Sequence, residues 1–294
     1  MAGLKEVRNR ISSVGSTRQI TQAMKLVSAA KLRRAQDAIT QMRPYAEKLQ
    51  EILVNVSASL DSAENPYAEE RDVKRVLLVA ITSNRGLCGP FNNNIIKLTN
   101  QRLSELKDKE VGVLCLGKKA NDALRRSGHV TTLDLGETPH RIFDNLDFAH
   151  TAEIAEQIMA AFRNGKYDRV EILYNRFVNA AVQDVQCEQM LPIEQNAVAD
   201  TAETVATTAD YIFEPSREEI AENIVPNTLK IQLYKSLLDS HASEHGARMT
   251  AMHKATENAG ELLRDLKLSY NKARQAAITA EILEIVGGAE ALEG

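Results

Sequence analysis

Three residues in the C-terminal part of the chain have the spacing of a metal-binding motif. His241, Glu244 and His245 form an H-x-x-E-H string, which on a helix places two imidazoles on one face with a carboxylate nearby, as in zinc peptidases with the inverted motif. Such a site also needs a third ligand and a cleft, but the nearby downstream carboxylates lie on the same predicted straight helix. Zinc-dependent peptide hydrolysis is therefore the weaker hypothesis, and we expect no metal, no cofactor and no catalytic residue.

A glycine-containing turn is the second place where chemistry could occur. Residues 83–91 read Ser-Asn-Arg-Gly-Leu-Cys-Gly-Pro-Phe and lie between a predicted strand and a predicted helix, where backbone amides could hold a phosphate. The lysine of a P-loop is missing, and so is the third glycine of a dinucleotide-binding fingerprint. Because glycine often serves a tight turn alone, we favour a structural strand-to-helix turn.

The cysteines do not form a recognisable site. Cys88, Cys115 and Cys187 lack C-x-x-C or metal-ligand spacing, and their odd number cannot close a set of disulfides. The spacing of the cysteines and histidines also assigns no nucleophile and base. A reducing compartment fits these cysteines best, and catalysis has no support in the sequence.

The composition favours packed helices over a nucleic-acid or membrane-spanning protein. Of 294 residues 44% are hydrophobic, which is enough for a folded core, while aromatics are 4% and Trp is absent. Few aromatics leave little to stack on nucleic-acid bases, and no apolar run approaches the roughly 20 residues that cross a bilayer. We expect no nucleic acid and no membrane span.

Positive charge is concentrated at the start of the chain, although the net charge is -4. From charge alone, this basic segment could be a solvated helix face or could bind an acidic protein partner, and neither is favoured. Binding to a membrane surface fits less well, because the apolar side of this predicted helix is rich in Ala and lacks Trp and Phe. The first 43 residues hold Glu6 and Asp37 as their acidic side chains, and their basic ones are Lys5, Arg8, Arg10, Arg18, Lys25, Lys31, Arg33, Arg34 and Arg43.

Two long helical segments must position these side chains. Apolar residues recur at three- and four-residue spacing from Leu4 to Leu60, and Pro44 is expected to bend this helix without ending it. After Pro226, residues 227–286 contain no Pro, so a second helix is expected to run until Gly287 and Gly288 end it. Long helices persist through tertiary contacts, and these two are each other's nearest partner.

Between the helices the pattern changes to alternating strands and helices. Strands are expected at 76–81, 111–116, 169–174 and 180–191, with helices at 91–107, 118–127 and 150–164 and a polar connection at 194–208. The predicted fold is α/β, an antiparallel coiled coil of long terminal helices that flanks an inserted Rossmann-like sheet domain. The predicted parts are residues 1–60, 70–215 and 216–294.

Both ends of the chain carry specific motifs, which are ITQAMKLVSAAKL at 20–32 and ITAEILEIVGGA at 278–289. Supporting stretches are the turn Gly86 to Gly89, the segment 242–249 and the segment 270–275. With these motifs the chain resembles the gamma subunits of F-type ATP synthases over nearly its whole length.

The resemblance implies a non-catalytic central stalk that rotates inside a ring of three alpha and three beta subunits and couples transmembrane proton flow to ATP synthesis, with catalysis on the beta subunits. It also implies contacts with the epsilon subunit and the c-ring of Fo, regulation of ATPase activity and ion flow, and a peripheral place on the cytoplasmic side of a bacterial inner membrane. It begins with the first residues, which leaves no room for a transit peptide. A static coiled-coil scaffold is the runner-up.

The resemblance also implies contact residues. Met24 is expected near an acidic lever segment of a beta subunit, with Lys25, Arg33 and Arg34 on the same basic helix. Arg248 is expected to brace the coil near Met24. A further group is expected to meet the loops that grip the upper part of the stalk: Arg274, Gln275, Thr279 and Glu281.

Overall fold

The computed structural model describes residues 4–57, 66–69, 71–133, 135–136, 138–193 and 217–293. Contacts divide the chain into two compact units. The first unit, which we call the helix-pair unit, contains Met1–Ser28 and Met249–Gly294; the second, the sheet unit, contains Ala29–Arg248. Each long terminal helix contributes to both units, and the two units are described separately.

Helices α1 and α7 hold almost half of the residues. Helix α1 covers Leu4–Ser57 and α7 covers Arg217–Glu293. The strands are β1 (Arg75–Ile81), β2 (Glu110–Leu116), β3 (Val130–Thr131), β4 (Arg169–Phe177) and β5 (Gln183–Leu191). The shorter helices are α2 (Phe91–Glu105), α3 (Lys118–Leu124), the 3-10 turn η1 (Arg125–Ser127), α4 (Thr138–Arg141) and α5 (Phe148–Arg163).

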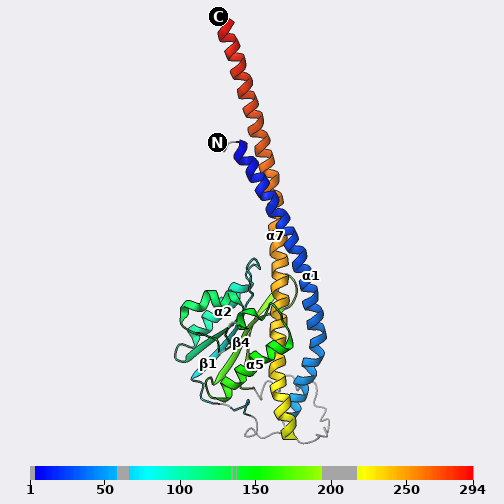
Figure 1. Cartoon of the computed structure of the whole chain (residues 1–294), viewed down its shortest axis with the longest axis vertical. Helices are drawn as coiled ribbons and strands as arrows, with labels where there is room; N and C mark the ends of the chain where they lie inside the picture. The colour runs from blue at the N-terminus through cyan, green and yellow to red at the C-terminus, as the bar shows by residue number, and fades with distance from the viewer. Residues whose placement is uncertain are drawn as a thin grey trace. The chain divides into compact units, whose positions relative to one another are not determined.

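The five strands form one sheet in the order β3-β2-β1-β4-β5. The neighbouring strands β1 and β4 are labelled in Figure 1. The pairs β1–β2, β2–β3 and β1–β4 are parallel, whereas β4 and β5 form an antiparallel hairpin. The chain leaves β1 in one direction along the sheet and returns to its other side as β4. This reversal between β1 and β4 is the point at which doubly wound sheets open a crevice beyond the carboxyl ends of their strands.

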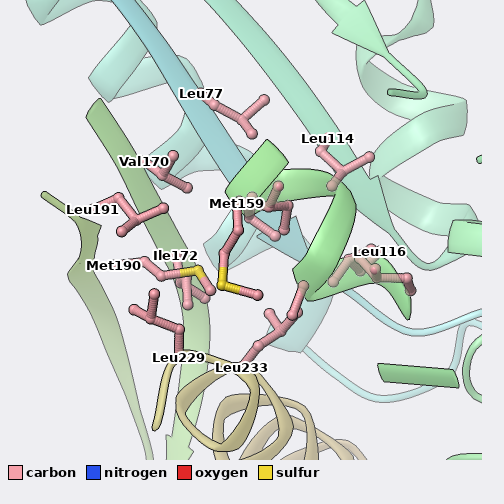
Figure 2. Close-up of a cluster of buried hydrophobic side chains, with 14 of the residues drawn as sticks. Leu77, Leu114, Leu116, Met159, Val170, Ile172, Met190, Leu191, Leu229 and Leu233 are labelled. Carbon is pink, nitrogen blue, oxygen red and sulfur yellow. The ribbon is translucent and has the colours of Figure 1, made fainter. Parts of the chain in front are cut away.

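Alternate side chains of the strands bury two separate cores. Even-numbered β1 residues, such as Val76 and Leu78, pack with α2 and α3 through Ile95 and Leu124. The opposite face packs against α5 and the first part of α7. Figure 2 shows this second core, including Leu77, Leu114, Met159, Ile172, Leu229 and Leu233. Because both faces are covered, β1 and β2 read as continuous apolar runs rather than alternating ones.

The predicted fold class is confirmed, with a mixed sheet inserted between two long helices. Each predicted strand and helix between the two long terminal helices is present within a few residues of its expected bounds. Short β3 and α4 were not predicted, because two and four residues are too few to show a period. The expected connection at 194–208 and the expected end of the first helix near Leu60 lie outside the described residues.

The last helix extends beyond the Pro-free stretch 227–286 at both ends, and the expected stop at Gly287 and Gly288 is wrong. Helix α7 begins at Arg217 and contains Pro226, because one missing amide removes a single hydrogen bond while Val225 and Leu229 are buried against the sheet. It also continues through Gly287 and Gly288 to Glu293. Glycine in a helix costs only about 1 kcal/mol relative to alanine, so it does not have to end one.

Gly117 is expected to tolerate no side chain. Its φ is 105°, and a Cβ there would collide with the carbonyl oxygen of Thr82 at the end of β1. We expect Gly117→Ala to lower the free energy of unfolding by about 2–4 kcal/mol through backbone strain and overpacking. Urea unfolding of the full-length chain measures this change.

The matched control is Gly128→Ala, since Gly128 also has a positive φ of 76° but open space around its Cβ position. It should cost about 1 kcal/mol, from the backbone conformation alone. Equal losses at Gly117 and Gly128 would contradict the collision.

Candidate partner-contact site

The two chain ends pair as antiparallel helices in the helix-pair unit. Arg8 Nη2 donates to the hydroxyl of Tyr270 at 2.8 Å, and Thr256 Oγ1 donates to Thr21 Oγ1 at 2.9 Å. Residue numbers rise along α1 as they fall along α7, which makes the pairing antiparallel. Cross-helix polar contacts of this kind fix the register of two helices that share a narrow seam.

The far end of α7 lies beyond this pairing. Since Arg8 lies opposite Tyr270, the first described residue of α1, Leu4, is near position 274, and α7 continues well past it. From 278 to 289 every described side chain is exposed. The exposed apolar residues there are Ile278, Ile282, Leu283, Ile285 and Val286, which are 44% to 71% exposed. A cluster of this kind is typical of a protein-contact surface.

The structure places the first group of predicted contact residues on α1. Met24 and Lys25 are half-buried in the helix-pair unit, where Lys25 Nζ lies 3.3 Å from Nδ1 of His253. Arg33 and Arg34 are exposed in the sheet unit. Their contacts with another subunit stay predictions.

The second predicted group lies on the far end of α7. Arg274, Gln275, Thr279 and Glu281 are all exposed, and Thr279 Oγ1 donates to the backbone oxygen of Gln275 at 3.0 Å. These four residues are therefore brought together on one exposed length of helix. Their grip by surrounding loops also stays a prediction.

The side chain of Arg248 forms hydrogen bonds with residues of its own chain. It is 7% exposed in the sheet unit, and its Nη1 donates to Glu244 Oε1 at 2.6 Å. Nη2 donates to the backbone oxygens of Arg85 at 3.0 Å and Gly86 at 3.3 Å. Burial raises the pKa of Glu244, and the adjacent Arg248 opposes that rise. Arg248 thus fastens α7 to the turn between β1 and α2, and a contact between Arg248 and another subunit stays a prediction.

The turn itself, residues 82–90, is the predicted strand-to-helix turn. Leu87 and Gly89 both have positive φ, 63° and 58°, and Leu87 is 64% exposed. The buried side chain of Asn92 accepts from the Ser83 amide at 2.9 Å and donates to Cys88 Sγ at 3.1 Å. Burial raises the pKa of the Cys88 thiol. Asn92 was not predicted from the sequence, where its one signal is a polar residue in the first turn of a helix that follows an apolar strand.

A second side of the same α7 segment packs on the β4–β5 hairpin. Ser243 Oγ donates to the backbone oxygen of Asn175 at 3.0 Å. A Cβ at Gly246 would lie 3.1 Å from the Cα of Ala180, so glycine allows close approach there. In the sheet unit, α7 therefore lies against the carboxyl ends of both β1 and β4, where doubly wound folds hold ligands.

The H-x-x-E-H string does not converge on one point. Glu244 binds Arg248, while the two imidazoles face each other with 3.1 Å between the Nε2 atoms of His241 and His245. Among the described residues no group of three or more His, Cys, Asp or Glu side chains could hold a metal. No helix within the described ranges is both long and apolar enough to cross a membrane.

Comparisons with known proteins agree with this architecture. The sequence model of the ATP synthase family matches residues 3–292. The chain is 58% identical over 295 residues to the ATP synthase gamma chains of Flavobacterium psychrophilum and Flavobacterium johnsoniae, and each comparison covers 100% of both proteins. It is 47% identical to the ATP synthase gamma chain of Chlorobium phaeobacteroides, again over 100% of both.

Solved structures show the same fold. A chain of the Tetrahymena thermophila mitochondrial ATP synthase central stalk and c-ring matches with a TM-score of 0.57 and 27% identity, over 80% of this chain and 99% of that one. A chain of the Euglena gracilis mitochondrial ATP synthase matches with a TM-score of 0.65 and 22% identity, over 98% of this chain and 94% of that one. The family match, the identity of the relatives and the shared fold together show that this chain belongs to the ATP synthase gamma-chain family.

Proposed function

We propose that this chain is the central-stalk rotor of an F-type ATP synthase. It turns inside a ring of three alpha and three beta subunits and couples proton flow to ATP synthesis, while the beta subunits carry out catalysis. Its other partners are the epsilon subunit and the c-ring, and through them it is held at the cytoplasmic side of a bacterial inner membrane. It needs no cofactor of its own.

The exposed apolar end of α7 carries this proposal. Within the helix-pair unit, Ile282, Leu283, Ile285 and Val286 have no helix of the described chain opposite them, since α1 begins near the level of 274. Apolar side chains of this size that are 54% to 71% exposed in one cluster are typical of a surface that other proteins bury. A surrounding ring of subunits supplies such cover on every side.

The predicted contact residues take their roles from this arrangement. Arg274, Gln275, Thr279 and Glu281 meet the loops of the ring around the exposed length of α7. Met24 and Lys25 lie near an acidic lever segment of a beta subunit, with Arg33 and Arg34 adding positive charge on the same helix. Different contacts of the stalk with each beta subunit select open or closed nucleotide sites in turn, which is a shift of population driven by differential contact.

A rotation assay tests the proposal against a static scaffold. Val182 lies at the tip of the β4–β5 hairpin and is 52% exposed, so Val182→Cys offers a labelling site. Cys88 and Cys115 are buried, whereas Cys187 is exposed, so Cys187 is replaced by serine and a thiol probe then reacts at the introduced cysteine. With a probe on this cysteine and the ring immobilised, we expect stepwise rotation of the probe on addition of ATP.

The same complex without nucleotide is the control and should show no directed rotation. Hydrolysis of ATP by the complex while the probe stays fixed would favour the scaffold.

A further inference from the structure

Two neighbouring histidines and one arginine form a directed chain of hydrogen bonds in the sheet unit. Arg248 Nη1 lies 3.4 Å from Nδ1 of His245, and Nε2 of His245 lies 3.1 Å from Nε2 of His241. The two rings are nearly perpendicular, with centroids 4.5 Å apart, and Phe143 stacks on His241 at 6.0 Å. All three polar residues lie on consecutive turns of α7.

The chain of bonds allows one arrangement of protons. A guanidinium has donors and no acceptor, so Nδ1 of His245 must accept from Arg248. His245 then carries its proton on Nε2 and donates it to Nε2 of His241, which therefore carries its own proton on Nδ1. A second proton on His245 would set a donor against Arg248, and a second proton on His241 would set two Nε2 donors against each other. Either protonation breaks a hydrogen bond.

The surrounding charges are mostly positive. The positive charges of Lys31 on α1 and Arg248 on α7 both lower the pKa of the two imidazoles. The positive charge of Arg85 in the turn lowers the pKa of Glu244. Glu244 is the acidic group of the cluster and is already paired with Arg248. From the segment beside α4, Phe143 faces His241, while its neighbour Asp144 accepts a hydrogen bond from Asn84. Among the described residues, no carboxylate is a cause of the pKa shift of either imidazole, so a new positive charge there meets mainly positive neighbours.

We propose that His241 and His245 form an acid-sensitive latch, which holds the β1–α2 turn on α7 while both imidazoles are neutral and releases it when they are protonated. This regulation goes beyond the proposed rotor function and does not depend on it. Arg248 connects the two ends of the latch, because the guanidinium that donates to His245 also donates to the carbonyls of Arg85 and Gly86. Repulsion at His245 displaces that guanidinium, and the turn loses its attachment.

The pH range follows from the direction of the shifts. Burial, the first cause, and nearby positive charge lower the pKa of His241 to about 4 and that of His245 to about 3. An open latch returns both to ordinary values near 6.5, so the open form binds more protons between these limits. The closed latch is fully stable above about pH 6.5 and is weakened progressively as the pH falls below it.

Cys88 reports on the latch. Its thiol is 2% exposed, lies in the turn and packs with Phe91 and Ala247, so release of the turn from α7 exposes it. We expect the alkylation rate of Cys88 in the full-length chain, divided by that of a free thiol at the same pH, to rise between pH 7.5 and pH 5.5. The rise should be about tenfold if opening takes up one proton and about a hundredfold if it takes up two. Peptide mass spectrometry separates Cys88 from the other two cysteines.

The double variant His241→Gln with His245→Gln should remove this pH dependence, because glutamine forms hydrogen bonds without titrating. His150→Gln is the matched control: His150 is exposed on α5 and pairs with Asp147, and this variant should keep the wild-type rise. Cys115, in the core of β2, should stay unreactive throughout.

Several results would overturn the latch. They are a flat Cys88 ratio in the wild type, an undiminished rise in the double variant, or a parallel rise at Cys115, which would mean general unfolding. Stoichiometric zinc binding lost in the double variant would also overturn it, since the imidazoles would then serve a metal. Independently of folding in any variant, nitrogen NMR of the wild type at pH 7.5 should find His245 protonated at Nε2 and His241 at Nδ1; two identical tautomers would contradict the proposal.

Discussion

Arg248→Leu should lower the free energy of unfolding of the full-length chain by about 3–5 kcal/mol, because it leaves a buried carboxylate without its partner. Glu244 is 7% exposed, and Arg248 is its ion-pair partner at 2.6 Å. The carbonyls of Arg85 and Gly86 lose a donor in the same variant. Urea unfolding followed by circular dichroism measures the loss.

The double variant Arg248→Leu with Glu244→Leu separates the unpaired charge from the lost packing. Replacing both members of a buried ion pair by apolar residues is often close to neutral, so the double variant should recover at least half of the stability lost by Arg248→Leu. A double variant that is less stable than Arg248→Leu would show that the bonds to the turn, rather than the buried charge, dominate.

Met24→Lys is expected to uncouple ATP hydrolysis from proton transport in the assembled complex. Met24 is half-buried on α1, and a lysine there can keep its carbon stem on the helix pair while its ammonium reaches outward. By the resemblance, an acidic segment of a beta subunit faces this position. A new charge pair of about 1–2 kcal/mol would then hold the stalk in one orientation in preference to the others. The measurement is the number of protons pumped per ATP hydrolysed in membrane vesicles.

Gln22→Lys provides the matched control for charge. It adds the same cation two residues away, at an exposed position on a different face of the same helix, and should leave coupling near the wild-type level. Thermal unfolding of the isolated chain should change little in either variant. Wild-type coupling in Met24→Lys, or an equal loss of coupling in Gln22→Lys, would contradict the contact assigned to Met24.

Most of the fold could be predicted from the sequence because its signals are local. The three- and four-residue spacing from Leu4 onward and the Pro-free stretch after Pro226 indicated α1 and α7, and the apolar run at 76–81 indicated a strand buried on both faces. The turn at 83–91 was recognisable from its glycines. The boundaries of the three predicted parts stay predictions, as do the subunit contacts of Met24 and of residues 274–281.

Other features depended on residues far apart in the chain. In the sequence, His241-x-x-Glu244-His245 has the spacing of one motif. In the folded structure, Glu244 instead pairs with Arg248, and the two imidazoles face each other. Nothing near Arg248 in sequence indicated that it would bind carbonyls at 85 and 86, more than 160 residues away.

The sequence by itself therefore determined the longer helices and strands, since helix and strand periods depend on neighbours a few residues apart. Only the tertiary structure decided which polar groups are buried and which partner each one has. A buried charge must find a compensating group wherever the fold supplies one, and that choice is made by packing in three dimensions rather than by spacing along the chain.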